Sequence, residues 1–60
     1  MTVKFLCSML RDDLGVFLEK GNHTLYTEVS KLSENNEVVE DFRFSHLGNS
    51  IVITVRNGVE

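Results

Sequence analysis

The sequence is poor in the residues that usually hold a very small protein together. Its 60 residues include one cysteine, no proline and no tryptophan. A single cysteine excludes a disulfide within the chain and favours a reducing, cytoplasmic setting over a secreted one. A chain of this length buries only about 60% of its unfolded surface, so residues 1–60 are expected to form one small domain of marginal stability. Oligomerisation is a usual support for such a domain.

Long hydrophobic runs and an excess of positive charge are also missing. No segment approaches the roughly 20 apolar residues of a membrane-spanning helix, so no membrane partner is expected. The net charge is −3, and the middle third of the chain concentrates acidic residues (Glu28, Glu34, Glu37 and Glu40 against Lys31). This stretch argues against phosphate binding, so nucleic acid is not the expected partner. It suits a solvated face that aids solubility, or a patch that docks on a basic partner.

Residues 38–55, VVEDFRFSHLGNSIVITV, show the clearest pattern in the chain. Apolar and polar residues alternate on both sides of Gly48-Asn49, which predicts two strands joined by a type II′ turn. A two-residue loop there predicts four cross-strand pairs: Leu47 with Ser50, Phe44 with Ile53, Phe42 with Val55, and Asp41 with Arg56. All the apolar pairs then share one face.

Two earlier segments also alternate. Residues 16–18 are followed by a hairpin loop at Glu19-Lys20-Gly21 and then by residues 23–32, HTLYTEVSKL. A two-residue turn at Asn35-Asn36 would pair this second segment with the strand after it. That register sets Glu28 opposite Arg43, Val29 opposite Phe42, and Lys31 opposite Glu40, which brings opposite charges together.

The N-terminal segment fits two structures. As a strand, residues 2–10 place Val3, Phe5, Cys7 and Met9 on one face; as a helix, apolar residues recur every three or four positions up to Phe17. We favour a strand over 2–7 and a short helical turn near 9–14. The predicted fold is therefore small and all-β, a four- to five-stranded antiparallel meander or barrel. The alternative is α+β, with an N-terminal helix on a three- or four-stranded sheet.

The last predicted strand poses a problem. Residues 51–55, IVITV, are uncharged, free of proline and strongly β-forming, which is typical of an aggregation-prone segment. In a simple meander this strand would be an edge with unpaired backbone groups. Either the N-terminal strand closes the sheet, or a second copy pairs with it. The second option predicts a homodimer with Ile51, Ile53 and Val55 at the oligomer interface.

No motif for catalysis or metal binding is present. Cys7, His23 and His46 are the only conceivable nucleophile and base set, and their spacing supplies no group to orient the base. Asp12, Asp13 and the two histidines lack the spacing of a metal site. We therefore predict no catalytic residue, no metal and no cofactor. Cys7 is expected to be a buried structural residue.

These observations favour binding over chemistry. We predict a non-enzymatic protein-binding module that acts by occupying a partner protein's surface. Small inhibitors or regulators from phages and mobile elements are proteins of this kind. The predicted partner-binding residues are Tyr26, Glu28, Glu34, Glu37 and Arg43, since tyrosine and arginine are enriched at binding hot spots. The alternatives are a small-barrel nucleic-acid-binding protein and a structural or assembly subunit.

Overall fold

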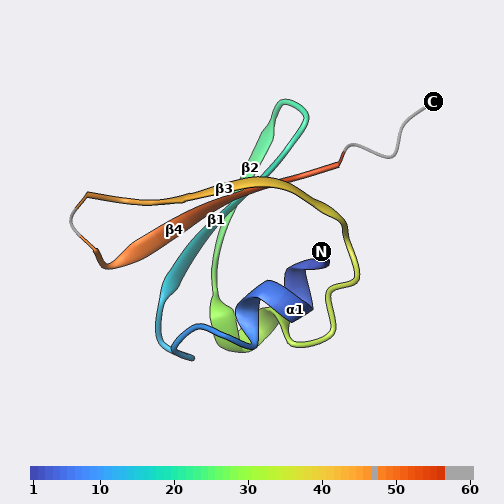
Figure 1. The fold of residues 1–60 in the computed structure, drawn as a ribbon. Coiled ribbons are helices and arrows are strands. Elements are labelled where there is room, and N and C mark those ends of the chain that lie inside the picture. The colour runs from blue at the N-terminus through green and yellow to red at the C-terminus, as the bar shows by residue number, and fades with distance from the viewer. Residues whose placement is uncertain (47, 57–60) are drawn as a thin grey trace.

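A four-stranded sheet with a helix and a 3-10 turn on one side makes up the protein (Figure 1). The computed structural model describes residues 1–46 and 48–56. The predicted small all-β class is confirmed, because strands are the main elements. In chain order the elements are α1 (Val3–Cys7), β1 (Gly15–Lys20), β2 (His23–Glu28), η1 (Val29–Leu32), β3 (Val39–Phe44) and β4 (Ser50–Val55).

The sheet is mixed, with the strand order β2-β1-β4-β3. β1 pairs antiparallel with β2 and parallel with β4, and β3 pairs antiparallel with β4. The predicted hairpin between β1 and β2 is present, with Gly21 at φ 60° in its turn. The predicted loop Glu19-Lys20-Gly21 is wrong, because Glu19 and Lys20 belong to β1 and the loop is the two residues 21–22. The predicted pairing of β2 with β3 is wrong, because these strands lie at opposite edges of the sheet and Glu28 does not face Arg43. The chain crosses from one edge to the other through η1.

The predicted exposed edge at residues 51–55 is also wrong. β4 lies inside the sheet, paired on both sides within the chain. Ile51, Ile53 and Val55 are buried in the chain's own core, so they are not available as the oligomer interface that the edge suggested. The physical reason is that β4 carries apolar side chains on both faces, which is typical of a central strand with a parallel neighbour.

The β3–β4 hairpin forms in a register shifted by two residues from the predicted one. Phe44 lies opposite Ile51 and Phe42 opposite Ile53. The longer loop closes at Ser45, whose carbonyl accepts the Gly48 N–H (2.9 Å). Because the shift is even, the phenylalanines stay on the predicted face. The expected Leu47–Ser50 pair lies outside the described residues.

A bulge at the start of β3 changes the partner of Asp41, which was predicted to pair with Arg56. The register shifts between Val39 and Asp41, so Asp41 lies opposite Thr54 instead of Arg56. The Arg56 Nε instead lies 3.9 Å from a Glu40 carboxylate oxygen. The extra residue is accommodated because a bulge sets two residues of one strand against one of its neighbour.

Residues Val3–Cys7 form a helix, so the predicted strand over 2–7 is wrong. Near 9–14 the chain makes short turns, as predicted: the Leu14 N–H donates to the Arg11 carbonyl (3.2 Å). Thr2 caps α1, and its hydroxyl oxygen accepts the Phe5 N–H (3.3 Å). The first free N–H groups of the helix are also satisfied: Val3 donates to the Glu37 carbonyl and Lys4 to the Asn35 carbonyl, both at 2.9 Å. These contacts explain how so short a helix forms. In this respect the structure matches the alternative expectation of an N-terminal helix on a sheet.

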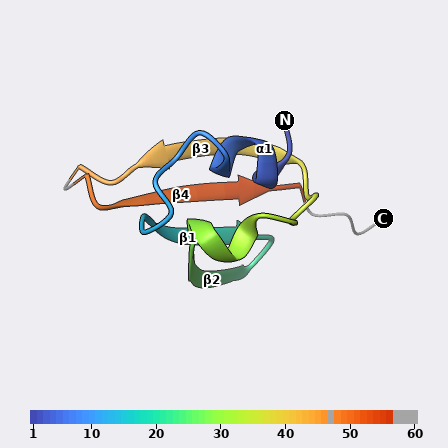
Figure 2. The ribbon, with the colours of Figure 1, turned by 90° about the horizontal axis from the view of Figure 1, so that it is seen from below.

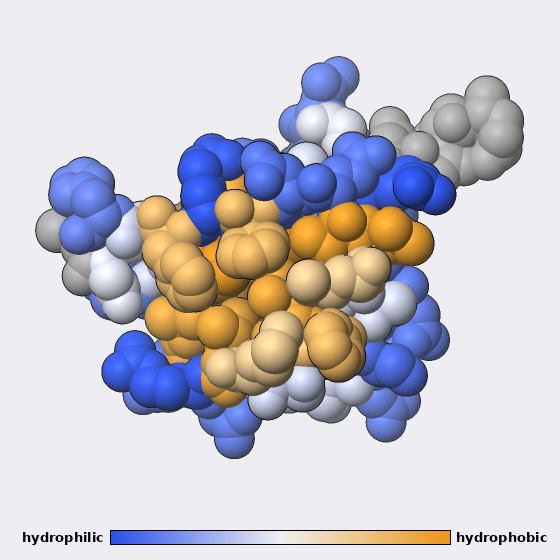
Figure 3. Space-filling model, viewed as in Figure 1, coloured by the Kyte–Doolittle hydropathy of each residue, from blue (hydrophilic) through white to orange (hydrophobic). Residues whose placement is uncertain are grey.

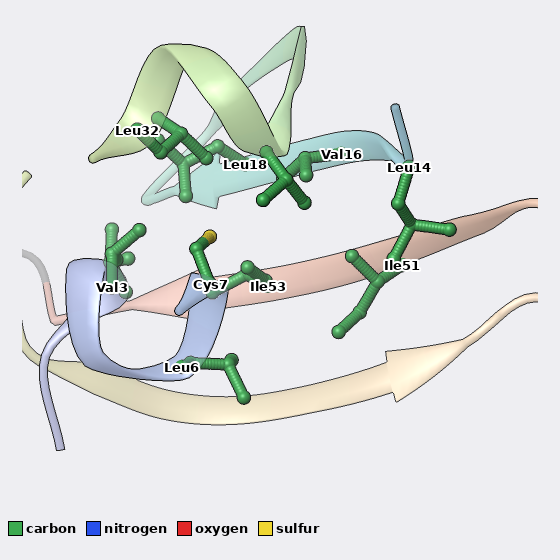
Figure 4. Packing of buried hydrophobic residues seen from close by; sticks show 11 residues of the cluster. Val3, Leu6, Cys7, Leu14, Val16, Leu18, Leu32, Ile51 and Ile53 are labelled. Carbon is green, nitrogen blue, oxygen red and sulfur yellow. The ribbon is translucent and has the colours of Figure 1, made fainter. Parts of the chain in front are cut away.

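One hydrophobic core lies between the sheet and the layer formed by α1 and η1. Figure 4 shows the buried side chains of α1 pointing toward those of β1 and β4. The centre of the core is aliphatic and fully buried, with Val3, Val16, Ile51 and Ile53 at 0% exposure. No buried polar side chain occurs among the described residues. No helix in this part of the chain is long and apolar enough to cross a membrane.

The core position of Ile53 predicts a measurable loss of stability on a small change. Ile53→Val removes one methylene group from a fully buried site and is expected to cost about 1 kcal/mol of unfolding free energy. Leu25→Val also removes one methylene group, but Leu25 is 60% exposed, so its cost should stay within about 0.5 kcal/mol. Urea unfolding followed by circular dichroism measures both. Equal losses would contradict the assigned core.

Candidate functional site

The helix and the 3-10 turn leave one face of the sheet uncovered. Figures 1 and 2 show α1 and η1 on the same side of the sheet. Side chains alternate between the two faces of a strand, so the registers assign the residues of the uncovered side, which we call the open face. Its members are Gly15, Phe17, Glu19, Thr24, Tyr26, Glu28, Asp41, Arg43, Ser50, Val52 and Thr54.

The centre of the open face is a row of four side chains across all four strands. The registers place Tyr26 beside Phe17, Phe17 beside Val52, and Val52 beside Arg43. The Phe17 and Tyr26 rings pack with centroids 4.8 Å apart and planes tilted by 55°. A hollow of 490 Å³ lies against this pair, lined also by Asn49 and Ser50. The row therefore presents aromatic surface to solvent in a fixed arrangement.

Gly15 makes room for the Tyr26 ring. A Cβ atom at Gly15 would lie 2.6 Å from the Tyr26 hydroxyl oxygen and 3.2 Å from two ring carbons. Glycine inside a strand often marks a place where another group approaches the backbone closely. The ring therefore lies over Gly15 and packs against Phe17, so two contacts fix its orientation. This role of Gly15 was not predicted from the sequence.

Polar and charged groups surround the aromatic row. The neighbouring row runs from Thr24 through Glu19 and Thr54 to Asp41. The Thr54 hydroxyl donates to a Glu19 carboxylate oxygen (3.2 Å), which links β4 to β1 on this face. Glu28 lies beyond the aromatic row on β2. The rim is therefore mainly acidic.

The structure brings together three of the five predicted partner-binding residues. Tyr26, Glu28 and Arg43 all lie on the open face, with Tyr26 and Arg43 in the same row but on opposite edge strands. Glu34 and Glu37 lie elsewhere, in the connection between η1 and β3.

Glu37 holds the chain's own elements together. A Glu37 carboxylate oxygen lies 2.7 Å from the Lys20 Nζ at the end of β1, and the other accepts the Asn35 side-chain amide (3.1 Å). The Lys20 hydrogen bond, and after it the Asn35 hydrogen bond, lower the pKa of the Glu37 carboxyl below its ordinary value. Because the Glu37 carbonyl also accepts the Val3 N–H, this residue connects β1, α1 and the crossover.

Cys7 and the histidines form no reactive arrangement. Cys7 is buried in the core, and desolvation raises the pKa of its thiol, which disfavours the reactive thiolate. A 290 Å³ hollow beside it is lined by Lys4, Cys7, Ser8, Asp12, Val29, Ser30 and Ser33. His23 begins β2 and His46 follows β3, so the two are exposed at opposite edges of the sheet. No group of three or more His, Cys, Asp or Glu residues is placed to hold a metal ion in the described ranges, 1–46 and 48–56.

Comparison with known proteins gave no match: no family model, curated protein or solved structure matches this chain. Function is therefore inferred from the chemistry of the chain's own surfaces.

The lowered pKa of Glu37 predicts a pH-dependent contribution to stability. Above the ordinary carboxyl pKa of 4.5 the ion pair with Lys20 is intact, and Glu37→Gln should cost about 0.5 kcal/mol. As the pH falls through the lowered pKa, the wild-type carboxylate gains a proton and this difference disappears. Urea unfolding at neutral and acidic pH measures the change. Glu34→Gln, an exposed carboxylate in the same connection, is the control, and a similar pH dependence there would refute the assignment.

Proposed function

We propose that the chain is a non-enzymatic protein-binding module that acts by placing its open face on a partner protein. The observation that carries this proposal is the row of exposed Tyr26, Phe17 and Arg43 that includes the half-buried Val52. Protein interfaces commonly combine an aromatic and apolar centre with a polar rim, and the open face has both. Tyrosine and arginine are among the residues that most often dominate binding energy.

The packing of the row favours binding further. Ordering a side chain on association costs free energy, which is reduced when the side chain is already held in place. Phe17 and Gly15 hold the Tyr26 ring before any partner arrives. Tyr26 as a whole residue is nevertheless 61% exposed, so the side chain remains available for contact.

The charges of the rim indicate the partner's chemistry. Glu19, Glu28 and Asp41 surround the row, with Arg43 as the basic residue among the open-face members, and the whole chain carries a net charge of −3. A partner with basic groups around an apolar depression fits this surface, since complementary charge steers association and suppresses wrong partners. A small cytoplasmic inhibitor or regulator, of the phage or mobile-element kind, would act in this way by covering a functional surface of its target.

Nucleic-acid binding is the second candidate. The Phe17–Tyr26 pair on an uncovered sheet supports it, because exposed aromatic rings on sheets stack with bases in several nucleic-acid-binding folds. The acidic rim opposes it, since phosphate contacts require a basic surface. Retention on single-stranded DNA or RNA that disappears with added salt would favour this candidate over a protein partner.

The proposal predicts unequal effects at two adjacent positions. Leu25 and Tyr26 are 60% and 61% exposed, neighbours on β2 that point to opposite faces. A photo-cross-linking amino acid at position 24, which replaces the exposed open-face residue Thr24 and keeps Tyr26, identifies the partner in a lysate of the source cells. Calorimetry with the purified partner then measures affinity. Tyr26→Ala should weaken binding about 30-fold, the loss of a typical hot spot. Leu25→Ala should stay within about threefold of wild type.

Circular dichroism confirms that both variants are folded. A purified protein partner that binds the Tyr26→Ala variant as tightly as wild type would refute the open face as the binding surface. Equal weakening by both variants would point to a general loss of structure or to another surface.

A further inference from the structure

A second hydrophobic surface lies where α1 faces β3. Figure 3, viewed as Figure 1, shows hydrophobic side chains gathered over these two elements. The large exposed side chains at or beside them are Met1, Phe5, Met9, Phe42 and Phe44, which we call the front patch. The Phe42 and Phe44 rings meet edge to face at 6.4 Å. Contiguous apolar surface of this kind on a small protein marks an interaction site.

The backbone beside the front patch is also free to pair. The Ser45 N–H donates to the Ser50 carbonyl (3.0 Å), which makes Ser45 and Ser50 a hydrogen-bonded pair. Hydrogen-bonded and non-bonded pairs alternate along an antiparallel ladder. Arg43 therefore bonds to β4, whereas the N–H and C=O groups of Phe42 and Phe44 point away from it.

Only the beginning of this edge is covered within the described part of the chain. The Val39 N–H donates to the Met1 carbonyl (2.8 Å), and Thr2 forms a bridge with Val38. Beyond this point β3 is an edge strand of the sheet, with β4 as its neighbour. Such an edge is a template for an additional strand.

We propose that a second copy of this chain covers the front patch through antiparallel pairing of the two β3 edges, centred on Phe42. In this register Phe42 lies opposite the partner's Phe42, and two backbone hydrogen bonds join them. The pairing ends where Phe44 lies opposite the partner's Glu40, because Met1 already occupies the edge beside Val39. Arg43 lies opposite the partner's Asp41, and the symmetry repeats this ion pair. The run Asp41-Phe42-Arg43 is thus complementary to itself, as a two-fold interface requires.

The charges select this register over its neighbours. The free N–H and C=O groups on this edge belong to every second residue, including Phe42 and Phe44. The two strands can therefore shift relative to each other only in steps of two residues. Centring on Arg43 would set it opposite the partner's Arg43, and centring on Asp41 would oppose two carboxylates. Centring on Phe44 leaves Arg43 opposite Ser45, without an opposite charge. Like charges directly opposite are destabilising, and aromatic and opposite-charge pairs are favourable.

The symmetry axis brings the apolar layers together. A two-fold axis through a hydrogen-bonded pair is perpendicular to the sheet, so α1 of each copy lies on the same side. Phe5 and Met9 then face their counterparts across the axis, which covers the front patch. The two sheets form one of eight strands, and their open faces become one continuous surface. The dimer does not depend on the function proposed for that surface.

A charge exchange tests the proposal. Sedimentation equilibrium from micromolar to millimolar concentration should show the wild type moving from 6.8 kDa toward twice that mass. Asp41→Arg and Arg43→Asp should each weaken dimerisation at least about tenfold, because each creates two like-charge pairs. The double variant D41R/R43D restores opposite charges and should return to within about threefold of wild type.

A cross-linking experiment tests the register without relying on charge. In a Cys7→Ala background, Phe42→Cys places two thiols on residues whose Cα atoms lie about 5.5 Å apart. Phe44→Cys is the matched control, since its two copies would be about 14 Å apart. A short bis-maleimide should join the first variant into a covalent dimer and not the second. Circular dichroism checks folding of every variant.

Three results would overturn the proposal. One is a mass of 6.8 kDa over the whole concentration range. Another is a dimer that both single charge variants leave unchanged or that the double variant fails to restore. The third is cross-linking at position 44 equal to that at position 42.

Discussion

The parallel pairing of β4 with β1 is the constraint on which the rest of the structure depends. It places the two most apolar strands side by side at the centre of the sheet, with Val16 beside Ile51 and Leu18 beside Ile53. A parallel pair needs a crossover, so β2 and β3 are forced to opposite edges. The crossover carries Val29 and Leu32 of η1 onto the same side as α1. The single core, the open face and the position of β2 and β3 as the two edge strands all follow from this pairing.

The crossover is also what makes the N-terminal helix possible. A five-residue helix rises only about 7.5 Å, and a helix so short is unstable alone. Carbonyl groups of Asn35 and Glu37 accept its first N–H groups, and Val3, Leu6 and Cys7 bury its inner side. Glu37 in turn holds Lys20 at the far end of β1. Local structure here is therefore a product of tertiary contacts, which explains why the pattern of residues 2–10 fitted both a strand and a helix and the strand was wrongly favoured.

From the sequence, the positions of the strands and the face on which each side chain lies were predicted better than which strands pair with each other. Period-two alternation is unaffected by an even shift of register, so Phe42 and Phe44 were assigned to the correct face despite a different loop. Tyr26 and Arg43, predicted as partner-binding residues, lie on the face away from the core.

What could not be predicted was the pairing of strands distant in sequence. Turn chemistry and cross-strand charge pairs favour hairpins between successive strands, and the register that paired β2 with β3 satisfied both. One clue pointed the other way: Ile51, Val52 and Ile53 are apolar on both faces, as suits a central strand. For the site, Gly15 in a strand was the available signal that an aromatic ring lies over the backbone.

Both uncovered surfaces have a common geometric cause. A helix of about 7.5 Å cannot cover strands of about 20 Å, so the core layer ends before it reaches Phe44. The opposite face has no layer of its own among the described residues, and its centre is nevertheless aromatic. The uncovered positions carry aromatic rather than polar side chains: Phe17 and Tyr26 on the open face, and Phe42 and Phe44 on the side of α1. The two uncovered surfaces therefore share one feature, aromatic rings that pack on each other in pairs while remaining exposed, and such rings gain free energy when another surface covers them.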